Sequence, residues 1–389
     1  MLMRMFGLAA MLVPFLPACH AAEIGPSGKV AVVRVPDGGI QPQVAVDEKG
    51  VVHMLYYKGD PGHGDIYYVR SRDGGVTFSA PMLVNSEPGS AVAAGNIRGA
   101  RIALGRNDRV HVAWNGSHQS GPAGPPGHEP MLYTRMNAAG SGFEPQRNLI
   151  QAAYVVDGGG AVAADRSGNV YVVWHAPVPG TEGEGNRTVW VARSTDDGKT
   201  FAREKRAWTE PTGACGCCGL DAFVDSKGTL YVLYRSAYET VHRDMYLLES
   251  RDRGATFTGA NISKWNVGAC VMSSESFAES PAGVLAAWET EKQVYYGRID
   301  PATGKMSPPA PAPGTGPNRK YPAVAGNARG ESIFAWTEGM GWAKGGTVKW
   351  QVYDKSGKPE AENGQSAGVP ASSLVAAFAR PDGKFVVVY

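Results

Sequence analysis

Cysteines supply the most distinctive chemistry in this sequence. Three of the five, Cys215, Cys217 and Cys218, fall within four residues in the stretch GACGCCGLDAF. A fourth, Cys270, stands in VGACVMSS, and Met272 follows it by two positions. Clustered thiolates with a thioether nearby are ligands that soft metals such as Cu(I) or Zn(II) accept. The pattern therefore predicts either a soft-metal site or a set of disulfides.

Three arrangements of these sulfurs are compatible with the sequence. Two disulfides, one of them joining Cys270 to the cluster, suit a protein outside the cytoplasm. Neighbouring Cys217 and Cys218 pair poorly with each other, because their Cβ vectors diverge on an extended chain. Copper or zinc held by the thiolates is the second arrangement, and one disulfide with two free thiols is the third. The C-x-C-C spacing is not a standard zinc signature, so it does not choose among them.

A repeated β-hairpin must position these residues. Seven times, a short strand, a glycine turn and an apolar strand ending in an aromatic residue follow one another, as in VAVDEKGVVHMLY and IALGRNDRVHVAW. The β-branched content and the central turn indicate hairpins, and the recurring period indicates a repeat architecture. The aromatics, spaced 58, 60, 60, 54, 48 and 53 residues apart, are Tyr56, Trp114, Trp174, Tyr234, Trp288, Trp336 and Tyr389.

A stricter motif follows three of the hairpins. SRDGGVTF, STDDGKTF and SRDRGATF all fit S-x-D-x-G-x-T-F. This motif resembles the Asp box of sialidases and related β-propellers, in which the Asp and Gly satisfy a tight turn between outer strands. The resemblance implies an all-β, sialidase-like β-propeller of four-stranded blades, and a structural role for the box. The residues of the motif are Ser71, Asp73, Gly75, Phe78, Ser194, Asp196, Gly198, Phe201, Ser250, Asp252, Gly254 and Phe257.

The hairpin count predicts seven blades, and six, the number in sialidases, is the alternative. The last hairpin ends at Tyr389 without outer strands of its own. The stretch GKVAVVRVP, residues 28–36, precedes the first hairpin and can supply an outer strand. We therefore expect residues 28–389 to form one propeller domain, with its ring closed between the N-terminal and C-terminal strands.

Propeller topology sorts the loops between two faces. Hairpin turns and Asp-box turns face the bottom, while the segments that lead into each innermost strand face the top. Residues 215–218 precede the innermost strand of the fourth blade and Cys270 that of the fifth, so the four sulfurs are expected to converge on the top face. His175 and His242, expected in top loops between second and third strands, are weaker candidate ligands, as is Met272.

The resemblance to sialidases also implies a catalytic constellation. Those enzymes use an arginine triad for the substrate carboxylate, a Tyr nucleophile with a Glu partner, and an Asp acid/base. Their Arg-Ile-Pro motif has only a loose echo in RVP, residues 34–36. No motif fixes the candidates, which are Arg235, Arg243, Arg319, Tyr321, Glu275 and Asp60.

The N-terminus has the pattern of an export signal. MLMRMFGLAAMLVPFLPAC has one positive charge, Arg4, and then an apolar run that ends in small residues. LPAC resembles the lipobox of bacterial lipoproteins, although Pro17 is unusual at its position. The resemblance implies a signal peptide over residues 1–18, a lipid on Cys19 and a tether over residues 19–27. Ordinary cleavage near Ala21 or Ala22 is the alternative, and both predict export, to the periplasm or as an outer-membrane lipoprotein.

Composition narrows the function further. The formal net charge is +2, which gives no sign of nucleic-acid binding, and after the first twenty residues no stretch is apolar enough to span a bilayer. The membrane is therefore expected as a partner only through the lipid anchor. The sequence predicts an exported binding module whose Cys-centred top face takes a small molecule, a glycan or a metal, with copper or zinc as the cofactor. The alternative is an exo-glycosidase that removes terminal sialic acids.

Overall fold

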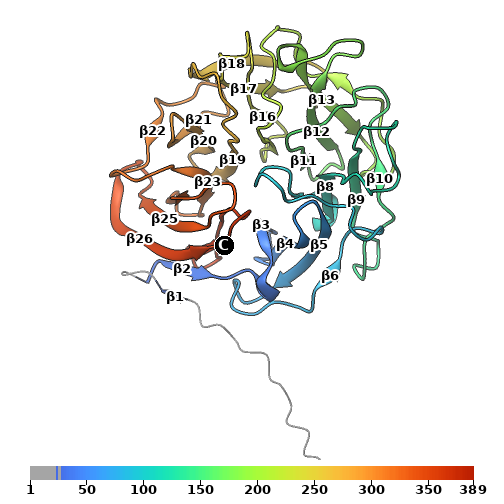
Figure 1. Ribbon diagram of the computed structural model, residues 1–389. Helices are drawn as coiled ribbons and strands as arrows, with labels where there is room; N and C mark the ends of the chain where they lie inside the picture. Colours follow the sequence, from blue (N-terminus) through green and yellow to red (C-terminus); the bar gives the residue numbers. More distant parts are fainter. Residues whose placement is uncertain (1–22, 25–27) are drawn as a thin grey trace, which may run out of the picture.

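The computed structural model describes residues 23–24 and 28–389, which form a ring of blades around a central axis (Figure 1). There are seven sheets of four strands each, so the prediction of seven blades is confirmed and the six-blade alternative is wrong. The predicted signal peptide, Cys19 and part of the predicted tether lie outside the described residues.

The chain fills blades 1 to 6 in sequence order, with one strand after another from the axis outward. Blades 1 to 3 are built from β3 (Ile40–Val46), β4 (Val52–Asp60), β5 (His63–Ser71) and β6 (Met82–Leu83), then β7 (Arg101–Leu104), β8 (Val110–Asn115), β9 (Met131–Arg135) and β10 (Arg147–Asn148), then β11 (Ala161–Ala164), β12 (Val170–Pro177), β13 (Arg187–Ser194) and β14 (Lys205–Arg206).

Blades 4 to 6 repeat this order. Three short 3-10 helices of the described chain lie earlier, in connections before and within blades 1 to 3. Blades 4 to 6 are built from β15 (Leu220–Val224), β16 (Leu230–Arg235), β17 (Met245–Ser250) and β18 (Thr258–Ser263), then β19 (Ser276–Ser280), β20 (Gly283–Thr290), β21 (Gln293–Ile299) and β22 (Ala310–Pro311), then β23 (Lys320–Gly326), β24 (Ser332–Glu338), β25 (Gly346–Tyr353) and β26 (Pro359–Val369). The 3-10 helices are η1 (Pro36–Gly38), η2 (Arg106–Asp108) and η3 (Glu184–Asn186).

Blade 7 joins the two ends of the propeller, as predicted. Its inner strands are β27 (Ala376–Ala379) and β28 (Phe385–Val388), and its outer strands are β2 (Val30–Val33) and β1 (Glu23–Ile24). Here β2 runs parallel to β28, whereas every other pair of neighbouring strands in the ring is antiparallel. After β2 the chain enters β3 from the top face, so β2 must run toward the top. The second strand of each blade also runs toward the top, and β2 is therefore parallel to β28, the second strand of its own blade.

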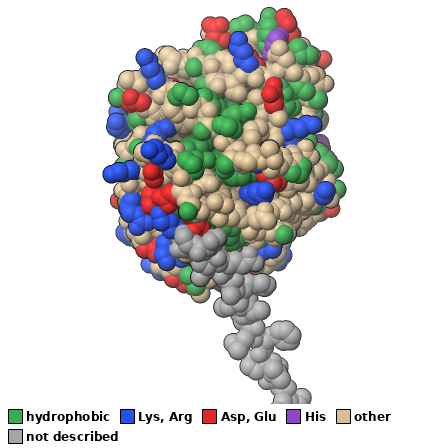
Figure 2. All heavy atoms as spheres, turned by 90° about the vertical axis from the view of Figure 1, so that its left-hand side faces the viewer, with side chains coloured by type: hydrophobic (Ala, Val, Ile, Leu, Met, Phe, Trp, Pro, Cys, Tyr) green, Lys and Arg blue, Asp and Glu red, His purple; other side chains and the backbone are tan. Residues whose placement is uncertain are grey.

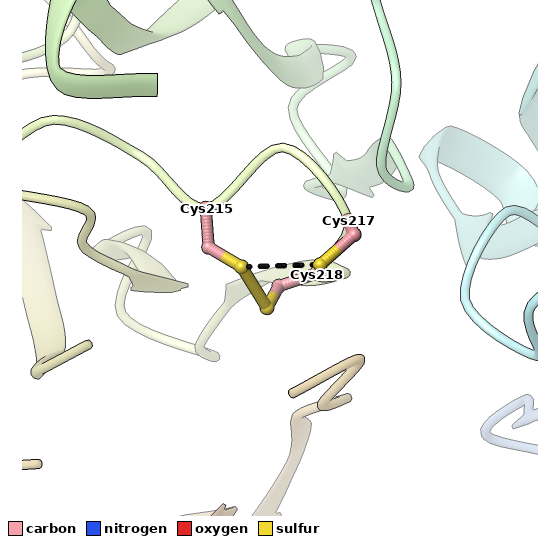
Figure 3. Close-up of side chains that lie close together, drawn as sticks. All are labelled: Cys215, Cys217 and Cys218. Atoms are coloured by element: carbon pink, nitrogen blue, oxygen red, sulfur yellow. Dashed lines mark hydrogen bonds between the residues drawn. A yellow bond between two sulfur atoms is a disulfide. The ribbon is translucent and has the colours of Figure 1, made fainter. Parts of the chain in front are cut away.

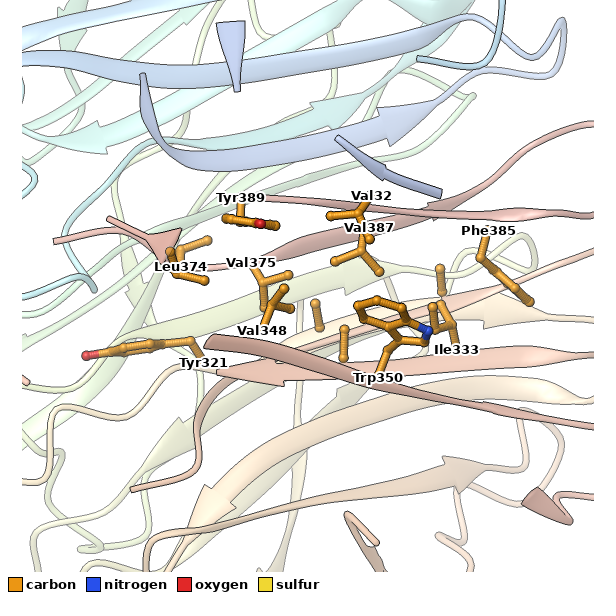
Figure 4. Close-up of a cluster of buried hydrophobic side chains, with 14 of the residues drawn as sticks. Val32, Tyr321, Ile333, Val348, Trp350, Leu374, Val375, Phe385, Val387 and Tyr389 are labelled. Atoms are coloured by element: carbon orange, nitrogen blue, oxygen red, sulfur yellow. The ribbon is translucent and has the colours of Figure 1, made fainter. Parts of the chain in front are cut away.

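The junction of blades 6 and 7 is packed with apolar side chains (Figure 4). Val32 from β2 and Val387 from β28 lie in one buried cluster with Trp350 from β25. Lys29 adds ion pairs across this junction, 3.0 Å to Glu331 and 2.6 Å to Glu360. The ring closure therefore rests on hydrophobic burial, with partly exposed ion pairs as a smaller contribution.

Hairpin turns on the bottom face share one local device. In the first blade the Asp47 carboxylate accepts hydrogen bonds from the N–H groups of Lys49 and Val51, at 2.9 and 2.8 Å. Gly50 completes that turn with φ of 76°, in the left-handed region that glycine tolerates. The same side-chain pattern recurs at Asp165, Asp225 and Asn327.

Tryptophans at the ends of second strands fix the blades to the loops beside them. Trp114 and Trp174 are fully buried, and their indole N–H groups donate to the carbonyls of Ser90 and Ala153, at 3.2 and 3.0 Å. Each accepting carbonyl lies in a segment that leads into an innermost strand. The periodic aromatics thus combine large apolar burial with a polar handle that holds the top loops.

The rim of the propeller carries interspersed acidic and basic side chains among apolar ones, as the side view in Figure 2 shows. Within the described part of the chain, no helix is long and apolar enough to cross a membrane.

Candidate functional site

The four top-face cysteines are bonded to one another. Cys215 pairs with Cys218, and Cys217 pairs with Cys270 on the neighbouring blade, with Cα–Cα distances of 5.4 and 6.3 Å. The predicted convergence of four sulfurs is therefore confirmed, in the two-disulfide arrangement. Figure 3 shows the first disulfide and the close approach of Cys217, whose Sγ lies 3.7 Å from that of Cys215. We call residues 215–218 with Cys270 the cysteine knot, a label for these two neighbouring disulfides and not for the threaded cystine-knot motif.

The knot is exposed on one side and buried on the other. Cys215 and Cys218 have at most 1 % of their surface exposed, Cys217 is half-buried, and Cys270 is exposed. The Sγ atoms of residues 215, 217 and 218 lie within 4.8 Å of one another. This spacing would suit a metal ion if the cysteines were reduced. In the disulfide form each sulfur is bonded to another sulfur, so the cysteines offer no thiolate, the ligand that soft metals prefer.

Charged side chains contact the backbone of the cysteine knot. Glu184 in η3 accepts hydrogen bonds from the Gly216 N–H at 2.6 Å and from Arg243 at 2.7 Å. Burial alone would raise the pKa of Glu184, but these hydrogen bonds and the charge of Arg243 lower it, so the carboxylate stays ionised. A Cβ at Gly216 would lie 2.9 Å from Oδ2 of Asp157, so a side chain at this position would displace the Asp157 carboxylate.

His175 is not in a top loop, which corrects the prediction. It lies near the end of strand β12, with 1 % of its surface exposed. Its Nε2 is 3.0 Å from the Cys218 carbonyl, and Nδ1 is 3.4 Å from an Arg187 nitrogen. Burial and then the charge of Arg187 lower its pKa to about 4. His175 is therefore a neutral ring that holds the backbone of the knot, since both its nitrogens are occupied.

The other two weaker candidates also have partners away from the sulfurs. His242 is partly exposed in the loop between β16 and β17, where Nδ1 lies 2.8 Å from Asn266 and Nε2 lies 3.5 Å from Glu239. Met272 has φ of 47°, and its terminal methyl approaches the Cα of Gly95 so closely that a Cβ there would lie 3.1 Å away. The sequence could not show these directions, because they depend on segments from three different blades.

Two of the three candidate arginines are completely enclosed by protein groups. Arg235 is 1 % exposed and donates to Ser273 at 2.7 Å, to the Arg243 carbonyl at 2.5 Å and to the Glu289 carbonyl. Arg319 is 2 % exposed and pairs with Glu338 at 2.9 Å. The remaining Arg319 donors bond to other protein oxygens, those of Gln293, Ala312 and Pro313.

The third arginine, Arg243, pairs with Glu184 beneath the cysteine knot. Its Nε and Nη1 are buried and make no hydrogen bond. Asp60, another of the candidates, is exposed at the end of β4, and its carboxylate lies 3.9 Å from Nε2 of His63. The arginines are thus placed in separate structural contacts, and the structure does not form them into one carboxylate-binding triad.

Glu275 and Tyr321 lie elsewhere, in the wall of a cavity along the propeller axis. This axial cavity has a volume of about 680 Å³ and is lined by all seven innermost strands. Alanines such as Ala45, Ala163 and Ala222 face it and leave its middle open. Its upper end is polar, because Gln43, Arg101, Asp221, Glu275 and Tyr321 all line it near the starts of their strands.

Two carboxyl groups dominate this upper end. Burial raises the pKa of Glu275 to about 8, so the side chain is mostly protonated at neutral pH. One of its oxygens lies 3.3 Å from the Ser273 hydroxyl, and Oε2 is buried without a hydrogen-bond partner. Burial also raises the pKa of Asp221, whose oxygens accept the N–H groups of Ala222 and Phe277, at 3.0 and 3.2 Å.

Arg101 provides a positive charge beside both carboxyl groups. The charges of Arg235 and then Arg101 lower the pKa of Glu275, and the charge of Arg101 lowers that of Asp221, in each case against the larger effect of burial. The Arg101 Nη1 donates to Gln43 at 3.2 Å. The sequence reasoning did not find Arg101, Asp221 or Gln43. The start of each innermost strand was the available signal, since those positions face the axis.

The segment 93–98 closes the top of the axial cavity. Ile97 is 1 % exposed, and its carbonyl would lie 2.2 Å from a Cβ at Gly159, so glycine is required there. Asn96 donates to the Ser373 carbonyl at 2.5 Å, and Gln41 donates to the Ala93 carbonyl at 2.7 Å. Loops of blades 1, 3 and 7 therefore hold this segment over the axis.

The cavity opens instead toward the bottom face. Its lining includes hairpin-turn residues, among them Glu48, Arg166 and Lys227, which are exposed. A ligand that reaches Glu275 would therefore enter between the hairpin turns and travel up the axis.

Solved structures of other proteins have a similar fold. The α-L-arabinofuranosidase Arb93A of Fusarium graminearum, in complex with an iminosugar inhibitor, superposes with a TM-score of 0.55 at 10% identity, over 86% of this chain and 97% of that chain. The α-L-arabinanase of Penicillium chrysogenum, complexed with arabinobiose, gives 0.52 at 12% identity, over 87% and 99% of the two chains.

A sialidase is also similar. Trypanosoma rangeli sialidase with the inhibitor DANA gives a TM-score of 0.50 at 13% identity, over 82% of this chain and 56% of the enzyme. The chain has the sialidase-like propeller fold. At these identities the likeness establishes the fold and not an activity. No protein-family model matches the sequence, and no curated protein matches it.

Proposed function

We propose that this protein is a carbohydrate-binding propeller that holds a small glycan at the closed end of its axial cavity. The observation that carries the proposal is Glu275, a buried carboxyl group with an unpartnered oxygen, beside Asp221 and Arg101. A buried polar atom without a partner is costly, and a ligand hydroxyl would satisfy it.

The donors and acceptors at this end match a polyhydroxylated ligand. Protonated Glu275 can donate one hydrogen bond, Asp221 accepts, and Arg101 donates. A sugar hydroxyl both donates and accepts, so neighbouring hydroxyls can use this mixed set. The volume of about 680 Å³ lies in the range of small-molecule pockets. Two proteins of similar fold are known with arabinobiose or an iminosugar bound, which supports the same ligand class.

Titration calorimetry with arabinobiose and with 3′-sialyllactose tests the proposal. We expect binding of at least one sugar, and about tenfold weaker binding in Glu275→Leu and Arg101→Met, since each removes a buried hydrogen bond worth about 1.4 kcal/mol. Trp342→Ala is the matched control, because Trp342 is exposed and is not among the residues that line the axial cavity. Unchanged affinity in Glu275→Leu would overturn the axial site.

Sialoside hydrolysis is the enzymatic alternative, and the arginine geometry argues for binding instead. Arg235 and Arg319 already spend their donors on protein oxygens, so they have little left for a substrate carboxylate. Release of a fluorescent leaving group from a sialoside measures the activity directly. Turnover that is lost in Arg319→Lys, with the fold retained, would favour the enzyme over the binding module.

Metal binding by the reduced cysteine knot is a second candidate, favoured by the 4.8 Å clustering of three sulfurs. Reduction of both disulfides would release four thiols, enough for one Cu(I) or Zn(II) ion. Anaerobically reduced protein should then take up about one equivalent of Cu(I), and Cys270→Ser should bind it more weakly. If reduced wild type and Cys270→Ser take up the metal equally, the knot is not the site.

Export and lipid attachment at Cys19 remain part of the proposal. Two disulfides are typical of proteins in oxidising compartments, which supports an exported protein. Metabolic labelling with a palmitate analogue should mark the wild type and not Cys19→Ser. Equal labelling of both would exclude Cys19 as the lipid site.

A further inference from the structure

A second hollow lies on the top face of blade 4, away from the axial cavity. It has a volume of about 420 Å³ and runs between residues 208–212 and the loop that joins β16 to β17. Tyr246 from β17 also lines it. We call it the blade-4 groove, and neither the cysteine knot nor the axial site uses it.

Aromatic rings form one side of the groove. Trp208 and Tyr246 have ring centroids 5.8 Å apart, and Tyr246 stacks on Tyr234 at the same separation. Trp208 rests flat against Gly259, where a Cβ would lie 2.6 Å from the indole ring. Three rings from different parts of the blade therefore form a continuous, supported row with one partly exposed indole at its end.

Tyr238, which also lines the groove, lies in a tight turn. Glu239 and Thr240 both have positive φ, 49° and 60°, and Tyr238 bridges to His242 across them. Three residues separate the bridged positions, and the His242 N–H closes this tight turn by donating to the Tyr238 carbonyl at 3.0 Å. Tyr238 is 47 % exposed, whereas the other fifteen tyrosines are buried or half-buried. An exposed ring on a rigid turn is preorganised for contact with a ligand.

The polar groups of the groove are acidic and neutral. Glu210 is exposed at its edge, and Asp244 lies within it, already holding the Trp265 N–H at 2.9 Å and Asn261 at 2.7 Å. Thr212 and Ser236 add hydroxyls to the lining. His242 is the only residue of the lining that can become cationic, so the groove disfavours anionic ligands.

We propose that the blade-4 groove is a subsite for a neutral oligosaccharide. The apolar C–H face of a sugar ring can stack on Tyr238 and Trp208, while its hydroxyls meet the carboxylates of Glu210 and Asp244. The carboxylates select against sialylated chains, which carry the same charge. This inference rests on the proposed carbohydrate-binding function, but it places binding at a separate surface with separate residues.

Calorimetric titration of the full chain with linear arabino-oligosaccharides, and with 3′-sialyllactose as the anionic probe, tests the subsite. We expect Tyr238→Ala to weaken binding of the neutral oligosaccharide about tenfold, because the loss of an aromatic contact costs about 1–2 kcal/mol. Trp342→Ala removes an even more exposed aromatic ring that is not part of the groove lining and should leave affinity unchanged. Quenching of Trp208 fluorescence by the oligosaccharide should disappear in Tyr238→Ala.

The same titration in the Glu275→Leu background separates the two proposals. Binding that persists in Glu275→Leu and is lost in Tyr238→Ala supports the groove even if the axial site fails. Binding that Glu275→Leu abolishes and Tyr238→Ala leaves intact overturns the groove alone. Preference of the groove for 3′-sialyllactose, or equal affinities of Tyr238→Ala and Trp342→Ala, would also overturn it.

Discussion

The two faces of this propeller are built by different rules. On the bottom, the turns after β5, β13 and β17 use the same hydrogen bonds, from the serine hydroxyl to the aspartate at 2.7 to 2.8 Å and from the threonine N–H to the aspartate at 2.9 Å. On the top, partners lie far apart in sequence, such as Cys217 with Cys270 and Asn96 with Ser373.

The difference shows which kind of contact repeats and which kind specialises. The serine–aspartate–threonine bonds of a bottom turn are completed within seven residues, so each blade can carry a copy, although a neighbouring blade also bonds to the turn, as Arg380 does to the Gly74 carbonyl. A top contact depends on two or more blades at once, so it is set only after the ring forms. Repetition therefore stabilises the bottom face, and variation on the top face shapes the sites.

The largest effect should come from a buried ion pair of the top face. Arg319→Ala leaves Glu338 buried with Lys349 and Trp336 as its remaining partners. We expect a loss of about 3–5 kcal/mol in the free energy of unfolding, measured by urea denaturation. Arg319→Lys should lose less, because it keeps the charge. A loss below about 1 kcal/mol in Arg319→Ala would show that the top face does not depend on this pair.

A second effect should come from the covalent link between blades 4 and 5. Cys270→Ser opens a disulfide between residues 53 positions apart. We expect a loss of roughly 3 kcal/mol, because the unfolded chain gains conformational freedom. Cys217→Ser with Cys270→Ser should cost no more than the single change. Wild type that shows the same stability with and without reductant would contradict this expectation.

The axial cavity should give the protein a stability that falls with rising pH. Burial holds the pKa of Glu275 at about 8 in the folded state, above its ordinary value of 4.5. The folded protein therefore keeps a proton that the unfolded chain has lost. Between about pH 5.5 and pH 7 the free energy of unfolding should fall by roughly 2 kcal/mol. Glu275→Gln should remove this slope, and an unchanged slope would show that another group causes it.

The smallest effect should come from a bottom turn. Asp196→Ala removes bonds to Ser194 and Thr200, each made near the surface, and should cost about 1 kcal/mol in thermal or urea unfolding. Asp196→Asn should lose less, since it keeps an acceptor. In the wild type, hydrogen bonds outweigh partial burial and lower the pKa of Asp196 to about 2. The stability from this turn is present above about pH 4 and is lost as pH falls toward 2. A loss from Asp196→Ala as large as that from Arg319→Ala would erase the distinction between the faces.

The same distinction explains how much of the molecule the sequence could predict. Blade number, ring closure and the convergence of Cys270 with residues 215–218 all follow from the period of the hairpins. The parallel pairing of β2 with β28 was not predicted, because a period reports spacing and not strand direction.

The site was harder to predict, because its decisive contacts are not periodic. His175 has the sequence position of a loop residue, yet β12 continues through it and buries it. The closure of the axis by Ile97 depends on Gly159 and on loops of other blades, which no local pattern reveals. Asp221 and Arg101 came together only because innermost strands of different blades face one axis.

The closed upper end of the axial cavity has a kinetic consequence. A tube open at one end is a well, so a ligand must leave by the mouth through which it came. A bulky substitution at the mouth, for example at Lys227, would therefore slow arrival and departure by the same factor. The equilibrium affinity would stay constant while the residence time grew, and the hairpin turns of the bottom face would set the exchange rate of a ligand they never hold.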